Sequence, residues 1–236
     1  MQRYLCEKLN NNKFELSNSD LYHITRVMRM KTGDNIEVVY NNEVYICSIE
    51  INNSNVTTTI LSKEENLNSN NVKKVLIIPL LKEQKMDLIL QKATELGVNK
   101  IIPVIMERSI IKLENNKEIK KLERWTKICK EASEQSKRID IPEIESVKTL
   151  KDLENIEGLK IVCSTKEKNN TIKKYLNKNK NFNCINFVVG PEGGISPKEE
   201  EYLNSIGFES VSLGTNIMRV ETVPMFLLSV LNYENM

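Results

Sequence analysis

Two glycine-containing loops near the end of the sequence have residue types and spacings suited to binding a ligand. The first reads Gly190-Pro191-Glu192-Gly193-Gly194. It follows an apolar, strand-like run over residues 184–189 and precedes Ser196, which together with Glu199 predicts the start of a helix. Because glycine has no Cβ, such a loop lets the backbone approach a ligand closely at the carboxyl end of a sheet.

The second loop, residues 214–222, follows a predicted strand over residues 209–213 and leads into an apolar helix over residues 223–231. A single Gly-Gly turn between a strand and a helix is more often structural than functional. Neither loop has the Gly-Lys-Ser/Thr of a phosphate-binding loop or a Gly-x-Gly-x-x-Gly fingerprint. The prediction of one shared site therefore depends on the pair of loops.

The composition is that of a globular protein with one large or two small domains. The 236 residues are 40% hydrophobic and 28% charged, and the net charge is +2. Five scattered cysteines without a Cys-x-x-Cys pair, and a single histidine, argue against a disulfide framework or a metal site and predict a cytoplasmic protein with reduced thiols. No apolar run is long enough to predict a membrane span.

Residues 1–70 predict a small β-rich domain. Strands over residues 36–40 and 43–49 flank Asn41-Asn42, a plausible two-residue hairpin turn, and a third strand covers residues 56–61. A predicted helix over residues 19–29 and the turn after it carry the compact basic cluster of this part of the chain, which consists of His23, Arg26, Arg29 and Lys31. A solvated helix face would have the same spacing.

Residues 72–236 alternate predicted strands with helices, and the boundary between the two domains falls in the polar run 66–71. The predicted strands cover residues 74–80, 100–106, 159–164, 184–189 and 209–213. A long helix is predicted over residues 117–136, and this alternation favours a parallel α/β sheet with helices on both faces. The helix over residues 223–231 has no polar face, which predicts either full burial or one half of a dimer interface.

The two loops together resemble the cofactor-binding signature of SPOUT-class RNA methyltransferases. Within that class the chain resembles the RsmE family, the 16S rRNA uridine-N3 methyltransferases. The second loop contributes Leu213-Gly214-x-x-x-Met218-Arg219-x-Glu221-Thr222. Further matches are His23, Val27, Arg29 and Gly33, residues 82–103, and the block from Glu131 to Pro142 with Glu134, Gln135, Ser136 and Arg138.

The resemblance implies an architecture, a cofactor and partners. A PUA-like β-barrel domain that docks on rRNA is expected at residues 1–70. A SPOUT domain with a C-terminal trefoil knot is expected at residues 72–236, and we expect this part to fold and bind cofactor on its own. The implied cofactor is S-adenosylmethionine, the implied substrate is 16S rRNA in the small ribosomal subunit, and the implied assembly is a homodimer without metal or membrane.

The resemblance also assigns site residues. Cofactor binding falls to Val189, Gly190, Pro191, Glu192, Gly193, Gly194, Leu213, Gly214, Met218 and Arg219. RNA binding falls to His23, Arg26, Arg29, Lys31, Lys85 and Arg138. Arg219 and Glu221 are the expected catalytic residues, with Arg219 stabilising charge on a uracil oxygen. Glu192 or Glu221 either accepts the N3 proton or orients Arg219, and Glu221 alternatively caps the following helix.

The sequence leaves three rival functions open. Another SPOUT enzyme, such as a tRNA ribose 2′-O-methyltransferase, is disfavoured by the N-terminal domain with His23 and Arg29. A non-catalytic RNA-binding protein is disfavoured by the intact Gly193, Gly194 and Arg219. A nucleotide-binding enzyme for a small metabolite would show no dependence on RNA.

Overall fold

The computed structural model describes residues 1–52, 55–64, 72–111 and 118–234. The chain divides into two compact units, Met1–Ser69 with Lys130–Ile141, and Asn70–Cys129 with Pro142–Met236. The predicted boundary at residues 66–71, and Lys117 at the predicted start of the long helix, lie outside the described residues. Segment 130–141, which contains Arg138, thus groups with the N-terminal unit.

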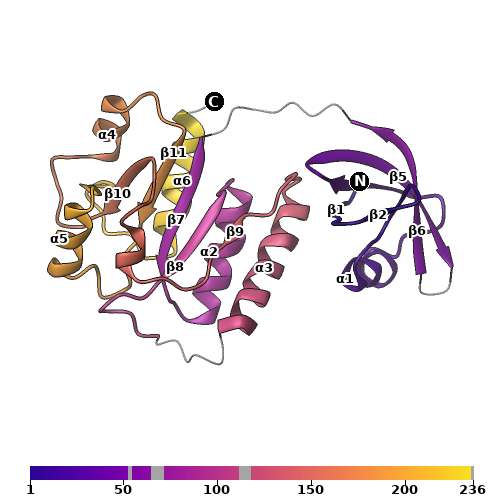
Figure 1. The fold of residues 1–236 in the computed structure, drawn as a ribbon, viewed down its shortest axis with the longest axis horizontal. Helices are drawn as coiled ribbons and strands as arrows, with labels where there is room; N and C mark the ends of the chain where they lie inside the picture. The colour runs from indigo at the N-terminus through magenta and orange to yellow at the C-terminus, as the bar shows by residue number, and fades with distance from the viewer. Residues whose placement is uncertain (53–54, 65–71, 112–117, 235–236) are drawn as a thin grey trace. The chain divides into compact units, whose positions relative to one another are not determined.

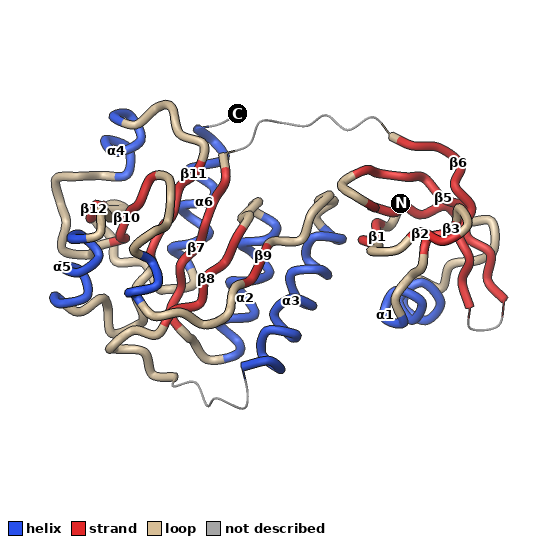
Figure 2. Tube along the Cα trace, viewed as in Figure 1, coloured by secondary structure: helices blue, strands red, loops and turns tan. Residues whose placement is uncertain are grey.

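The N-terminal unit is built on a four-stranded sheet in the order β1-β4-β5-β6 (Figure 2). Its strands are β1 (Arg3–Leu5), β4 (Asn35–Tyr40), β5 (Glu43–Asn52) and β6 (Asn55–Lys63). A small hairpin formed by β2 (Leu9–Asn10) and β3 (Lys13–Phe14) precedes α1 (Asn18–Tyr22). The predicted turn between β4 and β5 is confirmed, with φ of 50° and 61° at Asn41 and Asn42, the left-handed values that such a turn requires.

The predicted helix over residues 19–29 is helical only as far as Val27, and it changes type along its length. A capping box formed by Ser17 and Asp20 starts α1, and a π-helical turn, His23–Val27, follows it. This turn is closed by the amide of Met28, which donates to the carbonyl of His23 at 2.8 Å. Ile24 is fully buried, so the turn is anchored in the core of the N-terminal unit.

The C-terminal unit contains a six-stranded parallel sheet in the order β12-β10-β11-β7-β8-β9 (Figure 1). In chain order these strands are β7 (Lys73–Pro79), β8 (Lys100–Val104), β9 (Glu143–Ile144), β10 (Leu159–Cys163), β11 (Cys184–Val188) and β12 (Glu209–Val211). The predicted parallel α/β sheet is confirmed. Because all the strands run in one direction, the loops that follow them leave the sheet at one edge.

Helices cover both faces of this sheet, as predicted. They are α2 (Glu83–Glu95), α3 (Glu118–Gln135), α4 (Ile172–Lys178), α5 (Pro197–Ser205) and α6 (Thr222–Glu234), and a 3-10 turn spans Leu150–Leu153. Val75 and Ile77 of β7 share a core cluster with Leu203 of α5. Lys74, which points to the opposite face, donates to the side chain of Asn232 on α6.

Candidate functional site

The loop over residues 189–196 joins β11 to α5 at the carboxyl edge of the sheet. The amide of Gly194 donates to the carbonyl of Pro191 at 2.8 Å, which closes a tight turn. Gly194 has φ of 71°, and a Cβ on Gly190 would lie 2.7 Å from the side chain of Ile195. The loop therefore needs glycine at one position for backbone conformation and at the other for close packing.

A third loop, residues 105–111 after β8, contacts the first one. Glu199 accepts the amide of Ser196 at 3.0 Å in the predicted capping box, and its other carboxylate oxygen accepts the amide of Glu107 at 2.7 Å. Arg108 donates from Nη1 to the carbonyl of Gly193 at 3.0 Å, and a Cβ on Gly193 would lie 3.2 Å from the Cβ of Arg108. Arg108 was not among the predicted site residues.

The loop over residues 212–221 joins β12 to α6. Apart from the residues next to it in the chain, no described residue has an atom within 4 Å of the position that a Cβ would take on Gly214, and the same is true of Gly194 in the first loop. Leu213 and Met218 are half-buried apolar side chains in the second loop. Open space beside glycine backbone, with apolar side chains near it in sequence, fits a ligand such as an adenosine that is held by main-chain groups.

Lys85, in the first turn of α2, links the two glycine loops. Its Nζ lies 3.0 Å from Oε1 of Glu192 and 3.5 Å from Oε2 of Glu221. The Glu221 oxygen is buried and accepts no hydrogen bond from the residues that the structure describes, so its contact with Lys85 is an ion pair with loose geometry. The site thus holds one ammonium between two carboxylates.

The contact between Lys85 and Glu192 also shifts the pKa values of both residues. Burial alone raises the pKa of Glu192, but hydrogen bonds from its own amide and from Lys85 outweigh burial, and the net pKa lies below its ordinary value. The hydrogen bond with Glu192 in turn raises the pKa of Lys85. Both groups therefore remain charged at neutral pH.

Arg219 lies between the second loop and α6. Its backbone carbonyl accepts the amide of Thr222 at 2.9 Å and that of Val223 at 3.3 Å, which starts the helix. Its side chain is exposed and forms no hydrogen bond or ion pair with any residue that the structure describes. The carboxylate of Glu221 likewise accepts no α6 amide among the described contacts, so ion pairing, not helix capping, accounts for its position.

The predicted RNA-binding residues fall into different environments. Arg26, Arg29 and Lys31 are exposed in the N-terminal unit. Arg138 also belongs to that unit, but its side chain is only 11% exposed and its guanidinium binds Asp140 at 2.8 Å. Lys85 belongs to the C-terminal unit and faces the two carboxylates described above.

Other features lie away from this edge. A cleft of about 380 Å³ is lined by residues from the amino-terminal halves of β7, β8 and β11, including Lys73, Lys100 and Cys184. Lys100 is already paired with Glu145 there. Within the part of the chain that the structure describes, no group of three metal-ligating side chains is found, and no helix is long and apolar enough to cross a membrane.

The fold and the site define an α/β protein that can bind a ligand at the carboxyl edge of a parallel sheet and that carries an additional small β unit. Residues 68–232 match the model of an RNA methyltransferase domain, and residues 16–61 match that of an RNA methyltransferase PUA domain. The chain therefore belongs to the RNA methyltransferase family.

Individual relatives agree over nearly the whole length. The ribosomal RNA small subunit methyltransferase E of Mesomycoplasma hyopneumoniae is 35% identical over 97% of this chain and 98% of its own. The Bacillus subtilis protein of the same name is 31% identical over 99% and 97%. A methyltransferase of Legionella pneumophila, solved with bound S-adenosylmethionine, superposes with a TM-score of 0.89 at 30% identity, covering 98% of this chain and 96% of its own.

A fourth relative is the ribosomal RNA small subunit methyltransferase E of Neisseria gonorrhoeae, also solved with S-adenosylmethionine. It has a TM-score of 0.88 at 26% identity, with coverage of 99% of this chain and 97% of its own. The expected two-part fold, a parallel α/β unit with a PUA-type β unit, is confirmed by these matches.

Proposed function

We propose that this chain transfers the methyl group of S-adenosylmethionine to N3 of one uridine in the 16S rRNA of the small ribosomal subunit. The observation that carries the proposal is the pair of glycine loops joined by Lys85 at one sheet edge, in a chain of the RNA methyltransferase family. Relatives named for small-subunit rRNA methylation, and similar structures that hold S-adenosylmethionine, support the substrate and the cofactor.

The cofactor is proposed to lie against the open sides of Gly194 and Gly214. The adenosine is proposed to bind main-chain groups of Val189, Gly190 and Leu213, as expected from the sequence. S-adenosylmethionine supplies an electrophilic methyl group when bound. The protein then has to hold the base in line with that group, and positioning of this kind supplies much of the acceleration in such reactions.

The uracil ring is proposed to meet Arg219. Neutral uracil is a poor nucleophile at N3, and loss of the N3 proton places negative charge on the ring oxygens. The exposed guanidinium of Arg219 has no partner among the described residues, so it is free to stabilise that charge. Glu221 is our candidate for accepting the proton, because it is 16% exposed against 31% for Glu192 and has an oxygen without a hydrogen bond.

The N-terminal unit is proposed to position the rRNA, and α6 to form a homodimer contact. Val223, Leu227 and Leu231 of α6 are buried within the chain, whereas Phe226 and Val230 are half-exposed apolar side chains that a second copy would cover. Sedimentation equilibrium tests the dimer: a monomer at micromolar concentration would contradict it.

The activity is tested with purified protein and methyl-labelled S-adenosylmethionine. Small ribosomal subunits lacking the modification, naked 16S rRNA and bulk tRNA are offered as separate substrates. We expect label in the 16S rRNA of the subunits and none in tRNA, and loss of label with Arg219→Ala. Label in tRNA alone would support the ribose methyltransferase alternative, and cofactor binding without label in any RNA would contradict the proposed activity.

A further inference from the structure

The helical turn after α1 exposes large apolar side chains beside positive charge. We call this set the π-turn surface; it consists of Tyr22, His23, Arg26, Val27, Met28 and Arg29. Tyr22, Val27 and Met28 are 64%, 55% and 47% exposed. Apolar groups clustered so closely on one short turn, with arginines among them, are characteristic of binding surfaces.

The backbone of this surface is unusual in two ways. The turn is π-helical, a form that is rare and often found at functional sites. Arg29, just beyond it, has φ of 52°, a left-handed conformation that glycine adopts at lower cost. The amide of Met30 donates to the carbonyl of Ile24 at 3.0 Å across this residue, as at a helix end where glycine is usual. An arginine in this conformation indicates that the side chain of Arg29 has a functional role.

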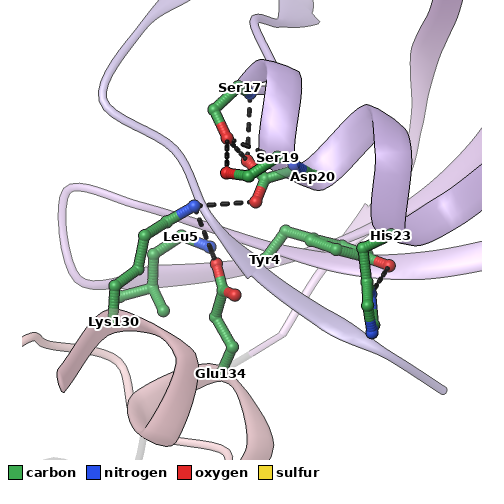
Figure 3. Close-up of polar contacts among 8 residues, drawn as sticks. All are labelled: Tyr4, Leu5, Ser17, Ser19, Asp20, His23, Lys130 and Glu134. Carbon is green, nitrogen blue, oxygen red and sulfur yellow. Dashed lines mark hydrogen bonds and ion pairs between the residues drawn. The ribbon is translucent and has the colours of Figure 1, made fainter. Parts of the chain in front are cut away.

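His23 is held in a fixed orientation within this surface. The Tyr4 hydroxyl lies 3.0 Å from Nδ1 of His23, and the other ring nitrogen of His23 points away from Tyr4 (Figure 3). Burial, together with the nearby Asp20 and Glu134, raises the pKa of Tyr4, so its hydroxyl keeps its proton. The hydrogen bond to Nδ1 holds the ring so that Nε2 lies on the side away from Tyr4 and can meet a polar group of a ligand.

The buried carboxylates of Asp20 and Glu134 share one ammonium, that of Lys130, which offsets part of their negative charge. Asp20, 4% exposed, lies 2.7 Å from Nζ of Lys130 and accepts the amide of Ser17 at 2.9 Å. Lys130 also pairs with Glu134, which accepts the amide of Leu5 (Figure 3). Arg26 and Arg29 form no ion pair with any described residue. The charges of Arg26 and Arg29 are therefore available to phosphates, and the π-turn surface fits a polyanion.

We infer that the π-turn surface binds unpaired nucleotides of the substrate RNA, with a base stacked on Tyr22, phosphates on Arg26 and Arg29, and a polar atom of the nucleotide hydrogen-bonded to Nε2 of His23. The inference rests on the proposed function and specifies the kind of RNA that the N-terminal unit recognises. A duplex keeps its bases stacked inside, so a tyrosine ring selects single strands, whereas arginines alone bind either form. Tyr4 is a positioning residue that acts through His23.

The test measures binding of the full chain to fluorescent dodeca-uridylate and to a duplex RNA of equal length, without cofactor. We expect tighter binding of the single strand, a loss of about fivefold or more with Tyr22→Ala, and retention within about twofold with Tyr22→Phe. Leu61→Ala, which removes a 55% exposed apolar side chain in the same unit, is the matched control and leaves affinity unchanged.

Three further variants separate the contributions. Arg29→Gly lowers the salt slope of log affinity by about 0.7, the value for one phosphate contact on a single strand, without lowering the thermal midpoint, because glycine tolerates the left-handed φ. Tyr22→Ala leaves that slope unchanged. Tyr4→Phe weakens binding in the native protein and has no further effect in the His23→Ala background, as a positioning role requires.

Equal affinity of Tyr22→Ala and native protein for the single strand, or no detectable binding of dodeca-uridylate at low salt, overturns the inference. Equal binding of single strand and duplex overturns it as well. Because these measurements need no methyl transfer, they fail or succeed independently of the proposed activity. A chain that methylates rRNA but ignores the Tyr22 change refutes the inference alone.

Discussion

The ammonium of Lys85 lies 3.0 Å from the carboxylate of Glu192, across 107 residues of sequence. The contact exists because β7 and β11 are neighbours in the sheet, so the first turn of α2 and the loop after β11 meet at the same edge. The second carboxylate, Glu221, approaches the same ammonium from the loop after β12. Lys85 is therefore better placed to hold the two glycine loops together than to contact RNA.

Lys85→Ala tests this arrangement. Without the ammonium, Glu192 and Glu221 repel each other, and we expect cofactor affinity to fall by a few-fold, because partly exposed ion pairs contribute little. Calorimetric titration with S-adenosylmethionine measures the effect. Since Lys85 is already neutralised by carboxylates, the salt dependence of RNA binding should stay as in the native protein. A weaker salt dependence of RNA binding in the variant would show that Lys85 contacts RNA.

Gly193→Val tests the first loop. We predict loss of cofactor binding with retention of the fold, because the new side chain displaces Arg108, whose Cβ lies 3.2 Å from the position of the added Cβ. Circular dichroism and calorimetry report fold and affinity. Adding Arg108→Gly, which removes that Cβ, should restore part of the affinity. Unchanged affinity in the single variant would take this loop out of the site.

Arg219→Ala tests catalysis. Turnover should fall by roughly 10² or more, as for loss of a charge-stabilising donor, while cofactor affinity changes only a few-fold. Arg219→Lys, which keeps charge but not the planar fork, should recover only part of the rate. Glu221→Gln should lower the rate as well, because an amide cannot accept the N3 proton. Near-normal turnover of Arg219→Ala would reject its assignment.

Glu37→Gln tests acid stability of the N-terminal unit. Burial raises the pKa of Glu37, but hydrogen bonds from Lys137 and Arg3 outweigh burial and hold it below its ordinary value of 4.5. A depressed folded-state pKa gives stability that is present above pH 4.5 and is lost as the pH falls through the folded value. At pH 7 the variant should lose about 1.5 kcal/mol, because it weakens the charge-assisted hydrogen bonds with buried Arg3 and partly exposed Lys137.

The measurement is urea unfolding between pH 7 and pH 3, with the variant expected to show less acid destabilisation than the native chain. Glu43→Gln is the matched control, since Glu43 pairs with Lys63 at the surface and should matter little. Parallel pH curves for native protein and Glu37→Gln would contradict the assignment.

Strong local signals made most of the fold predictable. Asn41-Asn42 and the Ser196 capping box are set by residues a few positions apart, and the structure confirms both. The strands β1, β2, β3 and β9 were missed because two or three residues are too few to show alternation. The change from α to π helix at His23 was not predictable from spacing. The trefoil knot stays a prediction of the family resemblance.

The site was predictable only in part, because it depends on strand order. The two glycine loops follow the last two predicted strands of the chain. That they share one edge of the sheet can therefore be predicted from neighbouring segments of the sequence. Arg108 is the second residue after the predicted strand 100–106, and that position was a usable signal. The pairing of Lys85 with Glu192 requires β11 to lie beside β7, which no local pattern reveals.

The grouping of segment 130–141 with the N-terminal unit changes how the two parts should be separated. Lys130 pairs with Asp20, and Glu134 accepts the amide of Leu5. Both partners lie before the expected boundary. Cutting the chain at residue 72 would leave both charges without these partners. Point changes such as Tyr22→Ala and Arg29→Gly therefore test RNA docking more cleanly than deletion of residues 1–70.

Nucleoside mass spectrometry of the small-subunit rRNA tests the proposed reaction most directly. Subunits lacking the modification are incubated with the purified protein and S-adenosylmethionine, and the rRNA is digested to nucleosides. We predict one new N3-methyluridine per 16S rRNA, absent with Arg219→Ala. A methyl group on a ribose oxygen, on another base, or on no nucleoside at all would contradict methyl transfer to uridine N3.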